Sequence, residues 1–219
     1  MMQSYKKILL SCVLACASAL SASAATWAPS LDVTTDKACY APGQTVTFKA
    51  VGTMPANTNI RYRHGSAVVE TARLTSSSWT WTPPTVDYQG YMAELFTTAA
   101  DGTETIVGTI AVDVSSQWTR FPRYGFVADF DNYKNAVDKN ANIKTEMAYL
   151  NRLHINGVQF QDWQWMHHKP VKFNNDGSLT QWYQDISNRC VGVEYVKNYI
   201  AEQHKYGMKS IFYDLCFGA

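Results

Sequence analysis

The sequence has no excess of either charge. It holds 19 Lys and Arg residues against 18 Asp and Glu residues, which leaves a formal net charge of +1. Both signs are scattered along the chain, and no basic stripe offers the surface that nucleic acid requires, so we expect no nucleic-acid partner. Charged residues make up 17% of the chain and hydrophobic residues 46%, a balance that favours a globular protein over a disordered one.

The sequence also lacks an apolar run long enough to span a membrane. The longest run, residues 8–20, falls well short of the roughly 20 residues that a spanning helix needs. Lys6 and Lys7 precede it and small residues follow it, which is the pattern of a signal peptide. We expect residues 1–24 to be removed and the protein to be secreted, periplasmic or at the cell surface, with no stable membrane span. Lipoprotein anchoring through Cys16 is the alternative.

Cysteines and cofactor motifs are scarce. Beyond residue 24 only Cys39, Cys190 and Cys216 remain, and an odd number at these spacings predicts unpaired thiols, neither a disulfide framework nor a zinc site. No P-loop, G-x-G-x-x-G motif or G-x-S-x-G elbow is present. The adjacent His167 and His168 have no third ligand at a suitable spacing. We therefore expect no metal and no cofactor.

Residues 25–116 predict an immunoglobulin-like β-sandwich. Short runs of strand-forming residues recur between turns such as Pro42-Gly43, at the spacing of such a fold. Residues 45–51 alternate apolar and polar side chains, as a strand with one buried face does. The predicted strands cover residues 31–36, 45–51, 59–65, 67–74, 77–83, 90–99 and 105–114.

Two tryptophans in this region have two interpretations. Trp79 and Trp81 are two residues apart, so they lie on one face of a strand. Aromatic residues make up 13% of the chain, and flat rings stack on sugars, which suggests a sugar platform. Packing in the core or between domains is the interpretation that we favour.

Residues 117–219 show a different pattern. Strands predicted at 124–130, 157–163 and 208–215 alternate with helices at 143–154 and 191–205. This order predicts a parallel sheet with right-handed crossovers, the first three strands of an incomplete (β/α)8 barrel, because a whole barrel takes about 200 residues or more. The helix residues expected to face inward are Met147, Leu150, Leu153, Val193, Val196 and Ile200.

Each of these three strands ends in an acid, namely Asp129, Asp162 and Asp214. In a barrel of this type the site is built at the carboxyl ends of the strands. The second strand is followed by a loop that carries Trp163, Trp165, His167 and His168. Rings for stacking and acids and imidazoles for hydroxyl groups suit a sugar ligand.

Three segments resemble glycoside hydrolase family 66, which contains dextranases and cycloisomaltooligosaccharide glucanotransferases. They are RFPRYGFVADF (120–130), HINGVQFQDWQWMHHKP (154–170) and YGMKSIFYDLCFGA (206–219). Two residues depart from the family pattern: Gln161 replaces an aromatic residue and Asp214 replaces Asn.

The resemblance implies a dextranase-like glycosidase that cleaves α-1,6-linked glucan, dextran or isomaltooligosaccharides, with retention at the anomeric carbon. Retention needs two carboxyl groups about 5 Å apart. In the family these lie on later barrel strands, so no catalytic residue is expected within this chain. The residues expected to bind substrate are Asp162, Trp163, His167, His168, Tyr213 and Asp214.

Two other functions fit the same residues. The chain is a non-catalytic glycan-binding protein if the β-sandwich alone binds sugar, or it comes from a cyclising glucanotransferase of the same family. Because the last predicted strand has no covering helix after it, we also expect the chain to be a partial sequence or a truncated gene product, inactive by itself.

Overall fold

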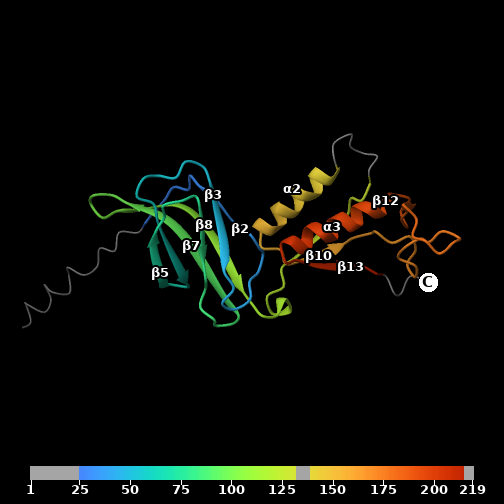
Figure 1. Cartoon of the computed structure of the whole chain (residues 1–219), viewed down its shortest axis with the longest axis horizontal. Helices are drawn as coiled ribbons and strands as arrows, with labels where there is room; N and C mark the ends of the chain where they lie inside the picture. Colours follow the sequence, from blue (N-terminus) through green and yellow to red (C-terminus); the bar gives the residue numbers. More distant parts are fainter. Residues whose placement is uncertain (1–24, 132–138, 215–219) are drawn as a thin grey trace, which may run out of the picture.

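The computed structural model describes residues 25–131 and 139–214. These residues form a β part (residues 26–114) and an α/β part (residues 118–214), which lie side by side in Figure 1. The predicted signal peptide, Cys16 and Cys216 lie outside the described residues. Within them, no helix is both long enough and apolar enough to cross a membrane.

The β part contains two sheets. The larger has the strand order β1-β8-β7-β4-β5 and the smaller β2-β3-β6. All pairs are antiparallel except β1 with β8. The strand bounds are β1 Thr26–Trp27, β2 Asp32–Thr35, β3 Val46–Val51, β4 Asn59–His64, β5 Ala67–Arg73, β6 Ser78–Trp81, β7 Gln89–Thr98 and β8 Glu104–Val114.

Seven of these strands lie where the sequence predicted them, because runs of strand-forming residues between turns mark them locally. In β3 the side chains are buried and exposed in strict turn, which is the period of a strand with one face on a core. The two-residue β1 was not predicted. It is too short to show any alternation.

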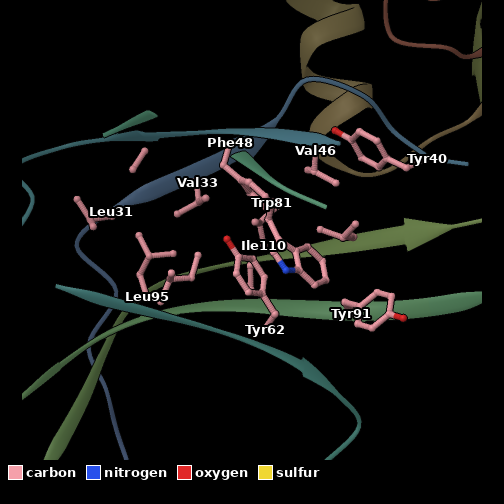
Figure 2. Close-up of a cluster of buried hydrophobic side chains, with 14 of the residues drawn as sticks. Leu31, Val33, Tyr40, Val46, Phe48, Tyr62, Trp81, Tyr91, Leu95 and Ile110 are labelled. Carbon is pink, nitrogen blue, oxygen red and sulfur yellow. The ribbon is translucent and has the colours of Figure 1, made fainter. Parts of the chain in front are cut away.

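The core of the β part lies between the two sheets (Figure 2). Tyr62 from the larger sheet stacks on Trp81 from the smaller, with ring centroids 4.0 Å apart, and Trp79 stacks on Phe48 at 5.1 Å. The Trp79 indole N–H donates to the Tyr62 hydroxyl at 3.0 Å, and that of Trp81 donates to Glu70 at 3.0 Å. Core packing, the favoured interpretation of the two tryptophans, is confirmed.

The α/β part contains a parallel sheet of order β13-β10-β9 and two helices on one side of it (Figure 1). Its core joins the sheet to both helices. The bounds are η1 Trp118–Arg120, β9 Tyr124–Val127, α2 Lys139–Arg152, β10 Gly157–Phe160, β11 Trp182–Gln184, β12 Cys190–Gly192, α3 Val193–Lys205 and β13 Lys209–Phe212.

Five of the six helix residues expected inside are buried or pack against this core: Met147, Leu150, Val193, Val196 and Ile200. Leu153 is the exception, with 50% of its surface exposed. The reason is that α2 ends at Arg152, two residues before the predicted end of the helix and just before Leu153. His154 then takes a left-handed conformation (φ 57°), and the N–H of Ile155 bonds back to Leu150 at 3.1 Å. This C-terminal cap turns Leu153 away from the core.

The predicted fold class is wrong. We expected an immunoglobulin-like β-sandwich followed by the first strands of an incomplete (β/α)8 barrel. The described residues are mostly β, with only two α-helices, and their strands form four separate sheets. The three parallel strands form an open sheet, and a β-hairpin lies between β10 and α3. Tyr124 and Phe126 on the uncovered sheet face are 62% and 68% exposed. Closure needs a full set of tilted strands, which the described residues do not supply.

The two parts contact each other at the C-terminal end of α2. The Asn151 side chain donates to the carbonyl of Thr35 at 2.8 Å, and Arg152 pairs with Asp32. Close by, the Arg123 guanidinium pairs with Asp113 at 2.7 Å. The bonds of Asn151 and Arg152 join residues more than a hundred positions apart in the sequence.

Candidate functional site

A cavity of about 520 Å³ opens at the carboxyl ends of β9 and β10. These two strands are parallel and in register, so the residues that follow them meet at one edge of the sheet. Asp129 and Asp131 follow β9 and Asp162 follows β10, and all three line the cavity with Asp185. We call it the acid-lined cavity. Its volume is in the range of small-molecule sites.

Among the described residues of this lining, Arg189 is the only cation, and it joins two of the acids. Its Nε lies 2.7 Å from Asp185 and its Nη2 lies 3.0 Å from Asp162. Partial burial alone would lower the pKa of Arg189, but the hydrogen bonds with Asp162 and Asp185 outweigh it and raise that pKa. The guanidinium therefore stays charged and fixes the spacing of both carboxylates.

Backbone hydrogen bonds hold the Asp185 carboxylate in addition to Arg189. Only 4% of this residue is exposed, and its Oδ1 accepts the backbone N–H groups of Ser187 and Arg189, each at 2.8 Å. These bonds fold residues 185–189 into a tight loop, in which Asn188 takes a left-handed conformation (φ 60°). The loop is thus built around one buried carboxylate.

Asp162 has an uncommon backbone conformation. Its φ is 50°, a left-handed value that is uncommon for a non-glycine residue and costs some free energy. The side chain also accepts a hydrogen bond from Gln161 at 3.0 Å. β10 ends at Phe160, and the chain turns at Asp162, which lines the cavity.

The hairpin β11–β12 forms the other wall, and the sequence analysis missed it. Trp182 pairs with Gly192 and Gln184 with Cys190, so these four residues share one face, while Tyr183 and Val191 face the core. Burial and the nearby Asp131 raise the pKa of the Cys190 thiol. Residues 185–189, a five-residue loop rich in Asp, Ser and Asn, could have indicated a hairpin. Each strand has only three residues, however, which is too few to show alternation.

The structure places the predicted substrate-binding residues in different surroundings. Asp162 lines the acid-lined cavity, together with Asp129. His167 is half-buried, and its Nδ1 is buried without a hydrogen-bond partner among the described residues. His168 and Asp214 are exposed, and neither lines this cavity.

Trp163 and Tyr213 belong to the structural support of the site. Trp163 is only 7% exposed and packs on Phe212 at 4.7 Å between ring centroids. Its indole N–H donates to the carbonyl of Tyr213 at 2.9 Å, and the Gln164 side chain donates to the same oxygen at 2.8 Å. These bonds anchor the loop after β10 to the end of β13. A role of Trp163 or Tyr213 in substrate binding stays a prediction.

The site offers hydrogen-bonding chemistry. In residues 25–131 and 139–214 no three His, Cys, Asp or Glu side chains are arranged to hold a metal ion. Cys39 and Cys190 are free thiols. The acid-lined cavity combines carboxylates, a guanidinium and the amides of Gln184 and Asn188, which together donate to and accept from many hydroxyl groups. Such a set of groups is suited to a polyhydroxylated ligand.

Comparison with known proteins identifies the family. Residues 35–219 match the sequence profile of glycosyl hydrolase family 66, and the chain belongs to that family. The resemblance seen in the sequence is thereby confirmed.

Known members resemble the chain over most of its length. Two cycloisomaltooligosaccharide glucanotransferases of Niallia circulans are each 28% identical to it, over 202 and 204 residues, or 85% of the chain. A crystal structure of a Paenibacillus sp. cycloisomaltooligosaccharide glucanotransferase, in complex with cycloisomaltoheptaose, superimposes with a TM-score of 0.70 and 28% identity over 86% of the chain. The chain spans only 20% of the length of the two curated relatives and 28% of the crystallised one.

Proposed function

We propose that the chain is part of a dextranase-like glycoside hydrolase that acts on α-1,6-linked glucan, and that the acid-lined cavity binds a glucose unit of this substrate. The observation that carries the proposal is the position of the cavity. It lies wholly within the region that matches the family, and its lining supplies hydroxyl-bonding groups from three separate segments. The relatives' names and the cycloisomaltoheptaose in the crystallised one support an α-1,6-glucan as the ligand class.

We propose further that the reaction retains the anomeric configuration and that the catalytic carboxyl pair is not among the described residues. A retaining enzyme needs one carboxylate free to attack and one carboxyl group free to give a proton. In the cavity the Asp162 and Asp185 carboxylates both bind Arg189, and Asp185 also accepts two backbone N–H groups. Both acids therefore serve to hold the site and its ligand.

The first test is binding and hydrolysis by the 219-residue chain. Calorimetric titration with isomaltooligosaccharides should show binding, and a reducing-end assay with dextran should show no hydrolysis. D162N keeps the shape of the side chain and tolerates the left-handed conformation, but it removes a charge from the cavity. We expect it to weaken binding about tenfold, a change of about 1.4 kcal/mol.

The matched control for D162N is an acid far from the cavity. D101N changes an exposed acid in the turn between β7 and β8, whose carboxylate bonds only its own turn, and should bind like the wild type. Absence of binding at millimolar isomaltooligosaccharide would contradict the proposed ligand. Measurable dextran hydrolysis would contradict the assignment of the catalytic pair to residues outside those described.

A cyclising glucanotransferase is the second candidate function. It is favoured by the relatives, three of which carry that name. Titration with cycloisomaltoheptaose beside a linear isomaltooligosaccharide of equal length separates the candidates. Tighter binding of the cyclic ligand favours the cyclising enzyme, whereas tighter binding of the linear one favours the hydrolase.

We also propose that the protein is exported after removal of residues 1–24. The basis is the sequence pattern of two lysines, an apolar run and small residues. The mass of the exported chain tests this: a chain that begins at Ala25 supports it. A chain that retains residues 1–24, or one that carries acyl groups on Cys16, contradicts it.

A further inference from the structure

A second cavity, of about 480 Å³, lies beside the acid-lined one. We call it the hairpin cavity, because residues of β11 and β12 contribute to its lining together with Glu194, Tyr195 and Lys197 from the start of α3. Trp182 and Cys190 line both cavities. The two cavities therefore meet on the outer face of the hairpin.

Trp182 is held at this meeting point by the hairpin. Strand alternation puts Tyr183 on the buried face, where it is 2% exposed and its hydroxyl donates to the carbonyl of Trp163 at 2.8 Å. Trp182 must then point outward, and it is 57% exposed. Among the described residues no other ring or cation stacks on it. One flat indole face is thus available between the cavities.

Exposure alone does not make Trp182 special, because single exposed apolar residues are normal. Trp27 on β1 is 60% exposed and lines neither cavity. What distinguishes Trp182 is the hydrogen-bonding chemistry on both sides of it. The acid-lined cavity holds Asp162 and Arg189, and the hairpin cavity holds Glu194 and Lys197. A polyhydroxylated chain would find paired donors and acceptors on each side of an apolar ring.

We infer that one α-1,6-glucan chain occupies both cavities and that Trp182 stacks on the sugar unit between them. The inference rests on the proposed function and extends it from one bound glucose unit to a run of units. Indole faces suit this position, because each offers a large, flat apolar area to the sugar ring. The hairpin thereby selects longer glucans over short ones.

The test is a titration of the 219-residue chain with isomaltose and with isomaltohexaose. The wild type should bind the longer ligand more tightly. W182A should weaken isomaltohexaose binding about tenfold and isomaltose binding clearly less, because only the longer ligand occupies both cavities. W182F, which keeps a ring, should restore part of the affinity, and W27A is the matched control and should bind both ligands like the wild type.

The contrary outcomes distinguish failure of the proposed function from failure of the role given to Trp182. If the wild type binds neither ligand, the proposed function fails and this inference fails with it. If the wild type binds but W182A equals it, or if W182A weakens both ligands equally, the bridging role of Trp182 is overturned while the proposed function stands. Circular dichroism of each folded variant excludes unfolding as the cause of a loss.

Discussion

At the scale of single residues, the site depends on one guanidinium placed between two carboxylates. Arg189 reaches Asp185 through Nε and Asp162 through Nη2, so the planar fork of arginine sets the distance between two segments of chain. Asp185 is almost fully buried, whereas the Arg189 side chain is 40% exposed. Solvent screening therefore weakens the ion pair, and hydrogen-bond geometry matters more than charge.

Removal of this guanidinium should destabilise the protein moderately. R189A leaves the buried Asp185 with only backbone partners, and we expect a loss of about 1–2 kcal/mol in the free energy of unfolding, measured by urea denaturation. R189K keeps the charge but not the fork, so it should recover less than half of this loss. The exposed Arg73, which bonds a single neutral amide oxygen on Asn57, gives the control R73A, with a change within about 0.5 kcal/mol. Equal losses for R189A and R73A would contradict the role of Arg189.

At the scale of elements, the β11–β12 hairpin is too short to be stable alone and is held by its neighbours. The Gly192 N–H donates to the carbonyl of Phe130, in the loop after β9, at 3.0 Å. Tyr183 packs beneath the hairpin, and burial, aided by the nearby Asp185, raises the pKa of its hydroxyl. The position of Trp182 thus follows from the contacts of the hairpin with Phe130 and with Trp163, in the loops after β9 and β10.

Gly192 is required here because of a close approach. A Cβ at this position would lie 2.6 Å from Cδ2 of Tyr195. We expect G192A to push the Tyr195 ring away and to cost about 1–3 kcal/mol of stability, measured by thermal or urea unfolding. The double variant G192A/Y195A should recover part of this loss. G90A is the strand control, because a Cβ at Gly90 meets nothing within 4 Å. A stable G192A with unchanged glucan binding would contradict the requirement for glycine at position 192.

At the scale of the whole molecule, the β part and the α/β part meet through buried polar groups. His154 is 7% exposed, its Nδ1 lies 3.3 Å from the carbonyl of Ala38, and its Nε2 has no partner among the described residues. Burial lowers the pKa of His154, although the nearby Asp113 opposes this. The junction therefore favours the neutral form of the His154 imidazole over the protonated form.

This junction should make stability depend on pH. The unfolded chain has the higher His154 pKa, near 6.5, so it binds the proton first as the pH falls. Stability is therefore complete above that value and declines below it, by at most about 1.4 kcal/mol per pH unit for this one group. H154N, which tolerates the left-handed backbone, should flatten the decline in unfolding free energy between pH 7 and pH 5. H204N, at an exposed position on α3, should leave it unchanged, and an equal slope for H154N and the wild type would refute the argument.

The sequence by itself determined the elements whose signal is local. A strand such as β3 follows from alternation within one segment, and Asp162 was found because it lies at the end of a predicted buried strand. The family, too, could be identified from short sequence motifs without knowledge of the fold.

Tertiary structure alone decided how distant segments meet. Arg189 contacts Asp162 from 27 residues away, and nothing in either segment predicts the other. Trp163, expected at the substrate, is held in the core by Phe212 and Tyr213, while Trp182, which no pattern singled out, lines both cavities. The incomplete barrel was wrongly expected because alternating strands and helices report only local order. Whether a ring of one tryptophan is buried or exposed depends on what packs against it, and that is settled only when the whole chain folds.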